Sequence, residues 1–314
     1  MHGFNQGRIT VGHLIDEFHP DIFLFQEHWL SPAGLSKFDI FRPEFISFGC
    51  SAMSESVSQG MLRGRPYGGV MVMFRSDLCA HIETIHCSDR FTVIKIGNII
   101  IINVYLPCVG TDNRFLICQN NLEDAWSWRM QFPLCECLIA GDFNVDLDSI
   151  DNFSIYVNQF IAHNLLHRCD NLFSGTKTAT YVNQALQCQS TIDYFLCSSP
   201  HIISNFTVLD PHVNFSDHLP ITVVCNCTLS SYERTPSRPL SVTQLRWDKA
   251  NIHSYYYHTG SCLEPLMSRL NNLIDQFKAE DPNIGFNINQ IYEEIVTILS
   301  ASSKLFVPLV KKIF

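Results

Sequence analysis

Five segments of the sequence place polar or ionisable side chains at the ends of strongly apolar stretches. The side chains that could carry chemistry are Glu27, Tyr105, Asp142, Asn144, Asp193, Asp217 and His218. A carboxylate at the end of a buried strand is costly unless it is paired or binds a metal ion. This oxygen-rich set suits Mg²⁺ or Mn²⁺ better than zinc. A hard divalent ion beside a histidine–aspartate pair suits phosphate-ester hydrolysis, because the metal offsets charge and an oriented base activates water.

The most specific segment is Ser216-Asp217-His218-Leu219-Pro220, which is followed by a β-branched run. Asp217 and His218 are adjacent, so on an extended backbone their side chains point to opposite sides. One of them can then bind a metal ion while the other faces the scissile bond or a buried carboxylate. A helix start is the competing interpretation, and Pro220 together with the run after it argues against a helix.

Two further aspartates lie beside buried strands. Asp142 and Asn144 follow the apolar stretch 137–140, and their spacing puts both on the same side of the chain. Gly141 allows a ligand or another backbone to approach closely. A turn-capping Asp/Asn pair is the alternative, but a cap does not need this order after a buried strand. Asp193 lies one residue inside a strand, where it needs a partner, and a histidine would be a natural one.

Glu27 and Tyr105 are weaker signals. Glu27, at the end of the apolar run 22–26, fits a metal ligand and a salt-bridge partner equally well. Tyr105 ends a strand just before Pro107, and on its own it would be an amphipathic strand-end residue. Both residues therefore depend on the other segments for a functional interpretation.

Short β-branched and aromatic runs predict seven strands in the first 228 residues, over 22–26, 69–74, 91–96, 99–105, 137–140, 192–196 and 221–225. Helices are expected over 8–18, 114–130 and 153–163. The continuous apolar run 99–102 indicates a strand covered on both faces, which favours a layered α/β sandwich. Gly97-Asn98 predicts an antiparallel hairpin between the strands on either side of it.

The composition changes to Ser, Pro and Arg near residues 230–239, which predicts a linker over 229–246. Beyond it, apolar residues recur at helical spacing over 263–277 and 288–299. We therefore expect a domain over 1–228 and a helical region over 247–314. Two helices are too few for a stable domain, so they would pack on the first domain or begin a domain that continues further.

The chain has 314 residues, of which 46% are hydrophobic and 16% charged, and its formal net charge is −9. This composition excludes disorder of the whole chain and a protein that coats nucleic acid through charge alone. The acidity belongs to residues 1–228, which carry 12 Lys and Arg against 22 Asp and Glu. Contact with nucleic acid would therefore depend on local arginine placement and a bound cation.

The 13 cysteines form no compact framework. The N-terminal residues lack the apolar core of a secretory signal, and the longest apolar run is too short for a membrane helix. We therefore expect an intracellular protein that is not secreted, with reduced thiols. Cys135 and Cys137, and likewise Cys225 and Cys227, suggest zinc, but strand alternation alone puts each pair on one face. Neither pair has a partner pair at zinc-finger spacing, which favours core packing.

Residues 1–228 resemble the endonuclease/exonuclease/phosphatase superfamily, the fold of apurinic/apyrimidinic endonucleases and DNase I. The resemblance rests on Gln26-Glu27, Asn103-Val104-Tyr105, Gly141-Asp142-Phe143-Asn144, Ile192-Asp193 and Ser216-Asp217-His218, which occur in the family's order and approximate spacing. Residues 2–8, 21–30 and 64–70 most resemble the endonuclease domain of non-LTR, LINE-type retrotransposons. The region from Leu245-Arg246-Trp247 onward is similar to the connector that precedes reverse transcriptase in such polyproteins.

The resemblance implies a four-layered α/β sandwich of two mostly antiparallel sheets flanked by helices, with a helical C-terminal tail. It also implies that Glu27 binds the divalent metal, Mg²⁺ or Mn²⁺, with Asp217 as a further ligand or water organiser. Asp142 would orient or deprotonate the attacking water, or protonate the leaving group. Asn144 would fix Asp142 and the phosphate.

By the same resemblance, His218 would contact the scissile phosphate and be oriented by Asp193, while Tyr105 would contact the phosphate from the opposite wall. The implied activity is Mg²⁺-dependent nicking of DNA, which opens a 3′-hydroxyl for target-primed reverse transcription. The implied partners are DNA and a reverse transcriptase domain in the same polyprotein, with action in the nucleus.

Two other functions stay open on the sequence. An RNA deadenylase, an inositol-phosphate phosphatase or a sphingomyelinase shares the same core motifs, although Arg63, Arg65 and the Gly-rich stretch after them resemble the retroelement enzymes. The second open possibility is an inactive remnant that acts as a binding module. It is favoured by one departure, because the family's metal-site asparagine precedes the glycine that matches Gly3, and neither His2 nor Asn5 fits its place. The first strand is therefore expected to be truncated.

Overall fold

The computed structural model describes residues 1, 3–54, 57, 65–173, 179–183, 185, 187–229, 241–278 and 284–313. The chain divides into two compact units, Met1–Tyr232 and Glu233–Phe314. Most of the range expected to be a linker, 230–240, lies outside the described residues, as does Arg63.

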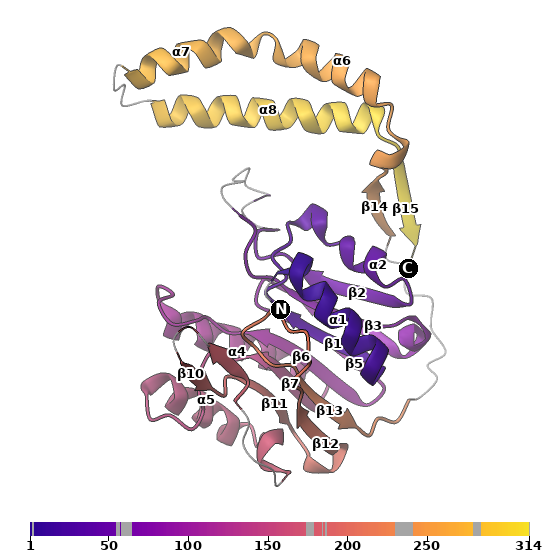
Figure 1. Cartoon of the computed structure of the whole chain (residues 1–314), viewed down its shortest axis with the longest axis vertical. Helices are drawn as coiled ribbons and strands as arrows, with labels where there is room; N and C mark the ends of the chain where they lie inside the picture. The colour runs from indigo at the N-terminus through magenta and orange to yellow at the C-terminus, as the bar shows by residue number, and fades with distance from the viewer. Residues whose placement is uncertain are drawn as a thin grey trace. The chain divides into compact units, whose positions relative to one another are not determined.

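The first unit contains a three-stranded antiparallel sheet in the order β1-β3-β2. Its strands are β1 (Ile22–Gln26), β3 (Val70–Arg75) and β2 (Phe45–Cys50). Helix α1 (Phe4–Phe18) lies over the outer face of this sheet (Figure 1), and the short helix α2 (Lys37–Phe41) packs beside it. The apolar residues of α1 recur every three or four positions, so Phe4, Val11 and Ile15 form one stripe that packs on the sheet.

The second sheet of this unit has six strands in the order β4-β5-β6-β7-β11-β8. The strands are β4 (Ile82–Cys87), β5 (Phe91–Ile96), β6 (Ile99–Tyr105), β7 (Glu136–Asp142), β11 (Asp193–Cys197) and β8 (His167–Arg168). Neighbouring strands run antiparallel except β6 and β7, which are parallel. The crossover between β6 and β7 is helix α4 (Arg114–Met130), and helix α5 (Asn152–His163) follows β7.

Smaller elements complete the unit. They are the antiparallel pairs β9 (Tyr181–Asn183) with β10 (Cys188–Ser190) and β12 (Ile203–Val208) with β13 (Ile221–Cys225). Short 3₁₀ helices are η1 (Pro32–Gly34), η2 (Ser76–His81), η3 (Cys169–Asn171) and η4 (Pro200–Ile202).

Strand β6 shows how the layers stack, because its side chains alternate between two cores. Ile100 and Ile102 point into the core formed with α4 and α5. Ile99 and Ile101 point into the core shared with the three-stranded sheet. The order is therefore helices, sheet, sheet, helices, and the predicted four-layered α/β sandwich is confirmed.

Several predicted elements have the bounds that the sequence indicated, namely strands 22–26, 91–96, 99–105 and 221–225 and helix 114–130. The predicted hairpin at Gly97-Asn98 is also confirmed, since Ile96 pairs with Ile99. Helix α1 begins at Phe4, four residues before the predicted start. Strands β2, β4, β8, β9, β10 and β12 were not predicted.

In its described residues, the second unit has three helices, where the sequence predicted two, and a two-stranded sheet. The helices are α6 (Ile252–Leu263), α7 (Leu266–Lys278) and α8 (Ile284–Phe306), with the 3₁₀ helix η5 (Trp247–Lys249) before them. Arg269 on α7 forms an ion pair of 2.5 Å with Glu294 on α8. Strand β14 (Ser241–Leu245) lies inside the range expected to be a linker. These residues form a strand because they pair with β15 (Leu309–Ile313), far along the chain.

Among the described residues, no helix combines the length and the hydropathy needed to span a bilayer.

Candidate active site

Three of the predicted site residues form one row across neighbouring strands of the six-stranded sheet. Tyr105 on β6 is the register partner of Asp142 on β7, and Asp142 is the register partner of Asp193 on β11. Residues two apart on a strand share a face. Each of the three therefore lies on the face that turns toward the three-stranded sheet, together with Ile101, Leu138 and Cys197. Sheet pairing alone brings these three side chains together.

Glu27 reaches the row from the other sheet. It follows the last residue of β1 and has a positive φ of 59°, which is uncommon for a residue other than glycine. Its main-chain N–H donates to the carbonyl of Gly69 at 2.9 Å. The Tyr105 hydroxyl donates a short hydrogen bond to the Glu27 carboxylate. Glu27 and Tyr105 thus join the ends of β1 and β6.

A buried amide pair fixes the two sheets just behind this contact. Asn103 is fully buried, and its Oδ1 accepts from Gln26 Nε2 at 2.5 Å. Its Nδ2 donates to the carbonyls of Phe25 and Met71 at 3.1 and 3.2 Å. Buried amides are costly unless all their polar atoms are paired, so these contacts favour one relative position of the sheets. That position sets Glu27 opposite Tyr105.

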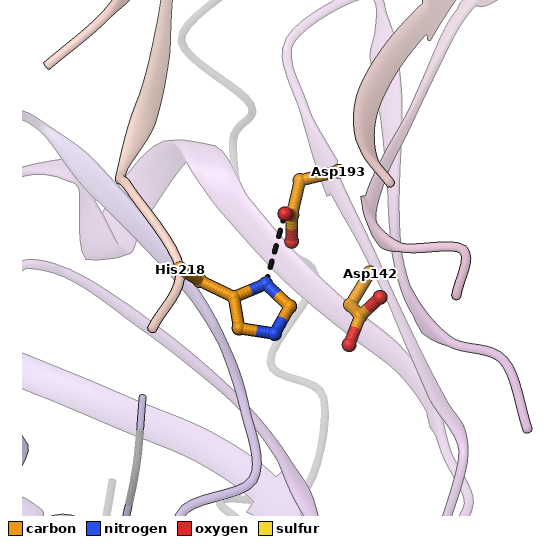
Figure 2. Close-up of side chains that lie close together, drawn as sticks. All are labelled: Asp142, Asp193 and His218. Atoms are coloured by element: carbon orange, nitrogen blue, oxygen red, sulfur yellow. Dashed lines mark hydrogen bonds and ion pairs between the residues drawn. The ribbon is translucent and has the colours of Figure 1, made fainter. Parts of the chain in front are cut away.

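His218 lies beside Asp193, as the sequence predicted. Its Nδ1 lies 2.9 Å from Asp193 Oδ2, and because a carboxylate only accepts, Nδ1–H is the donor. Figure 2 shows this bond, with the Asp142 carboxylate near the rest of the imidazole ring. Among the described residues, Nδ1 is therefore the ring nitrogen that holds His218 to Asp193.

Thr180 holds this pair in place, although its sequence context gave no functional signal. Its Oγ1 accepts from the main-chain N–H of Asp193 at 3.1 Å. Its carbonyl accepts from the N–H of Leu219 at 2.6 Å. The neighbouring Tyr181 ring packs edge-on against the imidazole of His218, with ring centroids 5.3 Å apart. Buried Thr180 therefore connects the segments that carry Asp193 and His218.

Asn144 binds both oxygens of the Asp142 carboxylate. Its main-chain N–H donates to Oδ1 at 2.8 Å and its Nδ2 donates to Oδ2 at 3.0 Å. Nδ2 also donates to the carbonyl of Leu106 at 2.9 Å. Asn144 adopts a positive φ of 52°, a conformation that asparagine tolerates better than most residues. Asp142 and Asn144 can therefore cap the turn and at the same time take part in a functional site.

The electrostatics of the row differ from one residue to the next. Burial, reinforced by the charge of Asp193, raises the pKa of Asp142 to about 8, against the opposing effects of His218 and the Asn144 N–H. Burial disfavours the charged form of His218, but the charge and hydrogen bond of Asp193 outweigh it and raise the pKa of His218 to about 9. Burial and the nearby Glu27 raise the pKa of Tyr105 well above its usual range.

Within the described residues, one group has three side chains close enough to share a metal ion: Asp142, Asp193 and His218, whose ligand atoms lie within 4.8 Å of one another. Four carboxylates influence the buried amino group of Met1. Burial lowers the pKa of this amino group, and the negative charges of Glu27, Asp193, Asp142 and Asp217 oppose that lowering. Such crowding of carboxylates suits a divalent cation with oxygen ligands. The carboxylates of this group therefore fit a divalent cation.

The structure thus brings Glu27, Tyr105, Asp142, Asn144, Asp193 and His218 into one connected site, with Asp217 in electrostatic range of it. Gln26, Asn103 and Thr180 support it and were not singled out as site residues. The first two lie in predicted strands next to candidate residues, which is a usable signal. Thr180 is recognisable only from its contacts.

The four cysteines of the two Cys-x-Cys pairs pack in or against the apolar cores. Cys137 is buried among apolar residues of one core, and Cys225 and Cys227 pack against the other. Core packing, the favoured interpretation of the Cys-x-Cys pairs, agrees with these positions.

Solved structures share this fold. The catalytic domain of APE2 from Xenopus laevis is 18% identical, with a TM-score of 0.55 over 74% of this chain and 92% of that one. The endonuclease domain of TRAS1, a telomere-specific non-LTR retrotransposon, is 14% identical, with a TM-score of 0.51 over 71% and 92%. A mannosyl-6-phosphatase of Bacteroides thetaiotaomicron is 16% identical, with a TM-score of 0.50 over 70% and 91%.

Identity this low shows a common fold and no more. Among curated proteins, a sequence search found no match. The sequence model described as "Endonuclease/Exonuclease/phosphatase family" matches residues 2–218, which is more than half of the chain and includes every predicted site residue. The motifs, the paired sheets and this match agree, and the chain belongs to the endonuclease/exonuclease/phosphatase family.

Proposed function

We propose that this chain is a Mg²⁺-dependent phosphodiesterase that nicks DNA, as the endonuclease domain of a non-LTR retrotransposon. The observation that carries the proposal is the row Tyr105–Asp142–Asp193, with Glu27 and His218 facing it from other segments. This arrangement offers a cation, proton-transfer groups and a carboxylate cluster around one point, which is what phosphate-ester hydrolysis needs.

The roles follow from each environment. His218 is cationic at neutral pH because its pKa is raised to about 9, so it can stabilise negative charge on a phosphate oxygen. Asp193 orients it through Nδ1. Asp142, held by Asn144, is suited to take a proton from water or to give one to the leaving oxygen, since its pKa lies near the working pH.

Glu27 and Tyr105 form the opposite wall. The raised pKa of Tyr105 keeps its hydroxyl protonated, so it can donate to Glu27 or to a phosphate oxygen. Glu27, with Asp217, would hold Mg²⁺, which when bound supplies charge neutralisation and activates water. The neighbouring carboxylates of Asp142 and Asp193 add to the negative potential that attracts the cation.

The retrotransposon assignment rests on sequence resemblance and is supported by the shared fold of the TRAS1 endonuclease domain. Three further proposals depend on this assignment. Residues 1–228 would be the endonuclease domain, and residues 247–314 would be a connector before reverse transcriptase. The protein would act in the nucleus during target-primed reverse transcription.

A supercoiled-plasmid assay with Mg²⁺ tests the activity. We expect open-circle product whose ends a DNA polymerase extends directly, because the proposed cleavage leaves a 3′-hydroxyl. Asp142→Asn and His218→Ala should abolish nicking. Asp112→Asn and His163→Ala, which replace exposed residues of the same types, should not.

Parallel assays on poly(A) RNA and a phosphoinositide separate the alternatives. Faster turnover of either substrate than of plasmid would replace the endonuclease proposal with another phosphoesterase of the family. Nicking that persists in both site variants would refute the assigned roles. Turnover of none of the three substrates would favour a binding module.

A further inference from the structure

Arg114 connects the two loops that lead out of the site. It is the first residue of α4 and is half-buried. Its Nε donates to the carbonyl of Pro107 at 3.0 Å, just after β6, and its Nη2 donates to the carbonyl of Asn144 at 2.5 Å, just after β7. The guanidinium lies over the ring of Phe153, 3.8 Å from its centroid. One side chain therefore links the segments that follow the carboxyl ends of two adjacent parallel strands, β6 and β7.

The Asn144 carbonyl belongs to the residue that fixes the Asp142 carboxylate. Asn144 directs two donors at Asp142, one from the main chain and one from the side chain. Its side chain also reaches the carbonyl of Leu106, next to the Pro107 carbonyl that Arg114 holds. Arg114 and Asn144 thus hold the same turn after β6 from two sides. A displacement of residue 144 as a whole would move both donors away from Asp142.

We propose that Arg114 is a positioning residue for Asp142. By joining the carbonyls of Pro107 and Asn144, it fixes the plane of the Asp142 carboxylate and so supports the hydrolysis rate. This inference rests on the proposed phosphodiesterase function. The planar guanidinium has donors in a fixed fork and can stack on an aromatic ring at the same time, whereas a lysine ammonium is a point donor that cannot reproduce this geometry.

A second arginine on the same helix supplies a matched control. Arg129, in the last turn of α4, donates from Nη1 to the carbonyl of Phe132 at 2.6 Å and lies 6.0 Å from the Trp126 ring centroid. It makes the same kinds of contact as Arg114, but at the opposite end of α4. Loss of Arg129 should therefore cost helix and packing stability without moving Asp142.

The first test is steady-state nicking by Arg114→Ala, Arg114→Lys and Arg129→Ala. We expect Arg114→Ala to lower kcat about 10- to 100-fold with KM changed less than about threefold, since a small misplacement of a reacting group costs this much. Arg114→Lys should remain impaired. Guanidinium chloride at millimolar, non-denaturing concentration should raise kcat of Arg114→Ala and leave the wild type and Arg129→Ala unchanged. A wholly structural role would give no such rescue.

The second test does not depend on activity. Hydrogen exchange followed by mass spectrometry should show faster exchange over residues 142–147 in Arg114→Ala and Arg114→Lys, but not in Arg129→Ala. Exchange over 193–197, on the neighbouring strand, should stay as in the wild type.

The two tests separate the outcomes. A wild type that does not nick DNA, with exchange over 142–147 raised in the Arg114 variants, would contradict the proposed function and support the positioning role. Wild-type exchange over 142–147 in both Arg114 variants, or kcat lowered equally in Arg114→Ala and Arg129→Ala without guanidinium rescue, would overturn the positioning role.

Discussion

Asp142 and Asp193 are register partners on adjacent strands, and their side chains share one buried face of the sheet. Like charges directly opposite each other on a sheet destabilise it. The two carboxylates are distinguished by what binds them, since Asn144 donates to Asp142 and His218 donates to Asp193. When two neighbouring carboxylates have different environments, separate acid–base roles can be assigned to them.

The first prediction concerns the coupling of Asp193 to His218. If Asp193 acts only by orienting and charging the imidazole, Asp193→Asn should lower kcat about 100-fold or more, His218→Gln should lower it further, and the double variant should equal His218→Gln. Steady-state nicking rates of the three variants, read as a double-mutant cycle, measure this coupling.

Additive losses in the cycle would mean that Asp193 acts on the substrate or metal directly. Asp170→Asn serves as the control, because Asp170 forms its ion pair with Arg168, away from the imidazole. It should change stability without changing the cycle.

The second prediction concerns pH and Asp142. A group whose pKa is raised in the folded state, here from 3.8 to about 8, contributes stability that is present below pH 4 and is lost as the pH rises through 8. In the presence of a metal chelator, the wild type should therefore lose roughly 6 kcal/mol of unfolding free energy over this range through Asp142, at about 1.4 kcal/mol per pKa unit. Urea unfolding of Asp142→Asn should show a flatter dependence and greater stability at pH 8.

Addition of Mg²⁺ at pH 8 should raise the unfolding free energy of the wild type more than that of Asp142→Asn, because a cation relieves the carboxylate crowding. Asp112→Asn, at an exposed position, should follow the wild type in both conditions. Parallel pH curves for the wild type and Asp142→Asn would show that the carboxylate is not destabilised by its surroundings.

The sequence indicates the candidate residues more directly than it indicates which strands pair. Asp142 and Asp193 are recognisable because carboxylates next to apolar runs need a partner, and each has one. Strands β5 and β6 are recognisable from continuous apolar runs joined by Gly97-Asn98. These signals are local, so no knowledge of the tertiary structure is needed to read them.

The features that were missed depend on tertiary contacts. Strand β4 alternates with polar residues and owes its position to pairing with β5. Strand β14 pairs with β15 across the whole helical region. Thr180 has no local signal, because its value lies in hydrogen bonds to segments at residues 193 and 219. Pairings between segments distant in the sequence cannot be read from one segment alone.

The third prediction concerns Gly141, the residue before Asp142. A Cβ at this position would lie 1.9 Å from the carbonyl oxygen of Val104 on β6, and its φ is +142°. Gly141→Ala should therefore separate β6 from β7 and lower the unfolding free energy by about 3 kcal/mol or more. Gly110→Ala is the matched control, since Gly110 also has a positive φ but nothing within 4 Å. Its cost should be about 1 kcal/mol.

Urea denaturation of both variants measures the difference. Equal costs at the two positions would mean that backbone strain, and not the approach of β6, decides the requirement for glycine at residue 141.

The fourth prediction concerns His28, which is fully buried next to Glu27. Its Nδ1 accepts from the N–H of Leu30 at 3.1 Å, so Nε2–H donates to the carbonyl of Cys50 at 3.0 Å. Burial lowers the pKa of His28 to about 4 from 6.5. A lowered pKa contributes stability that is present above pH 6.5 and lost as the pH falls through 4. The loss should be about 3 kcal/mol.

Urea unfolding of His28→Gln between pH 4 and 7 checks this prediction, because the variant has no imidazole to protonate. It should be less stable than the wild type at pH 7, and the difference should shrink by about 3 kcal/mol on going to pH 4. His201→Gln, which removes an exposed histidine, should leave the acid dependence of the wild type intact. If His28→Gln and the wild type differ by the same amount at both pH values, the neutral imidazole is not what acid disrupts.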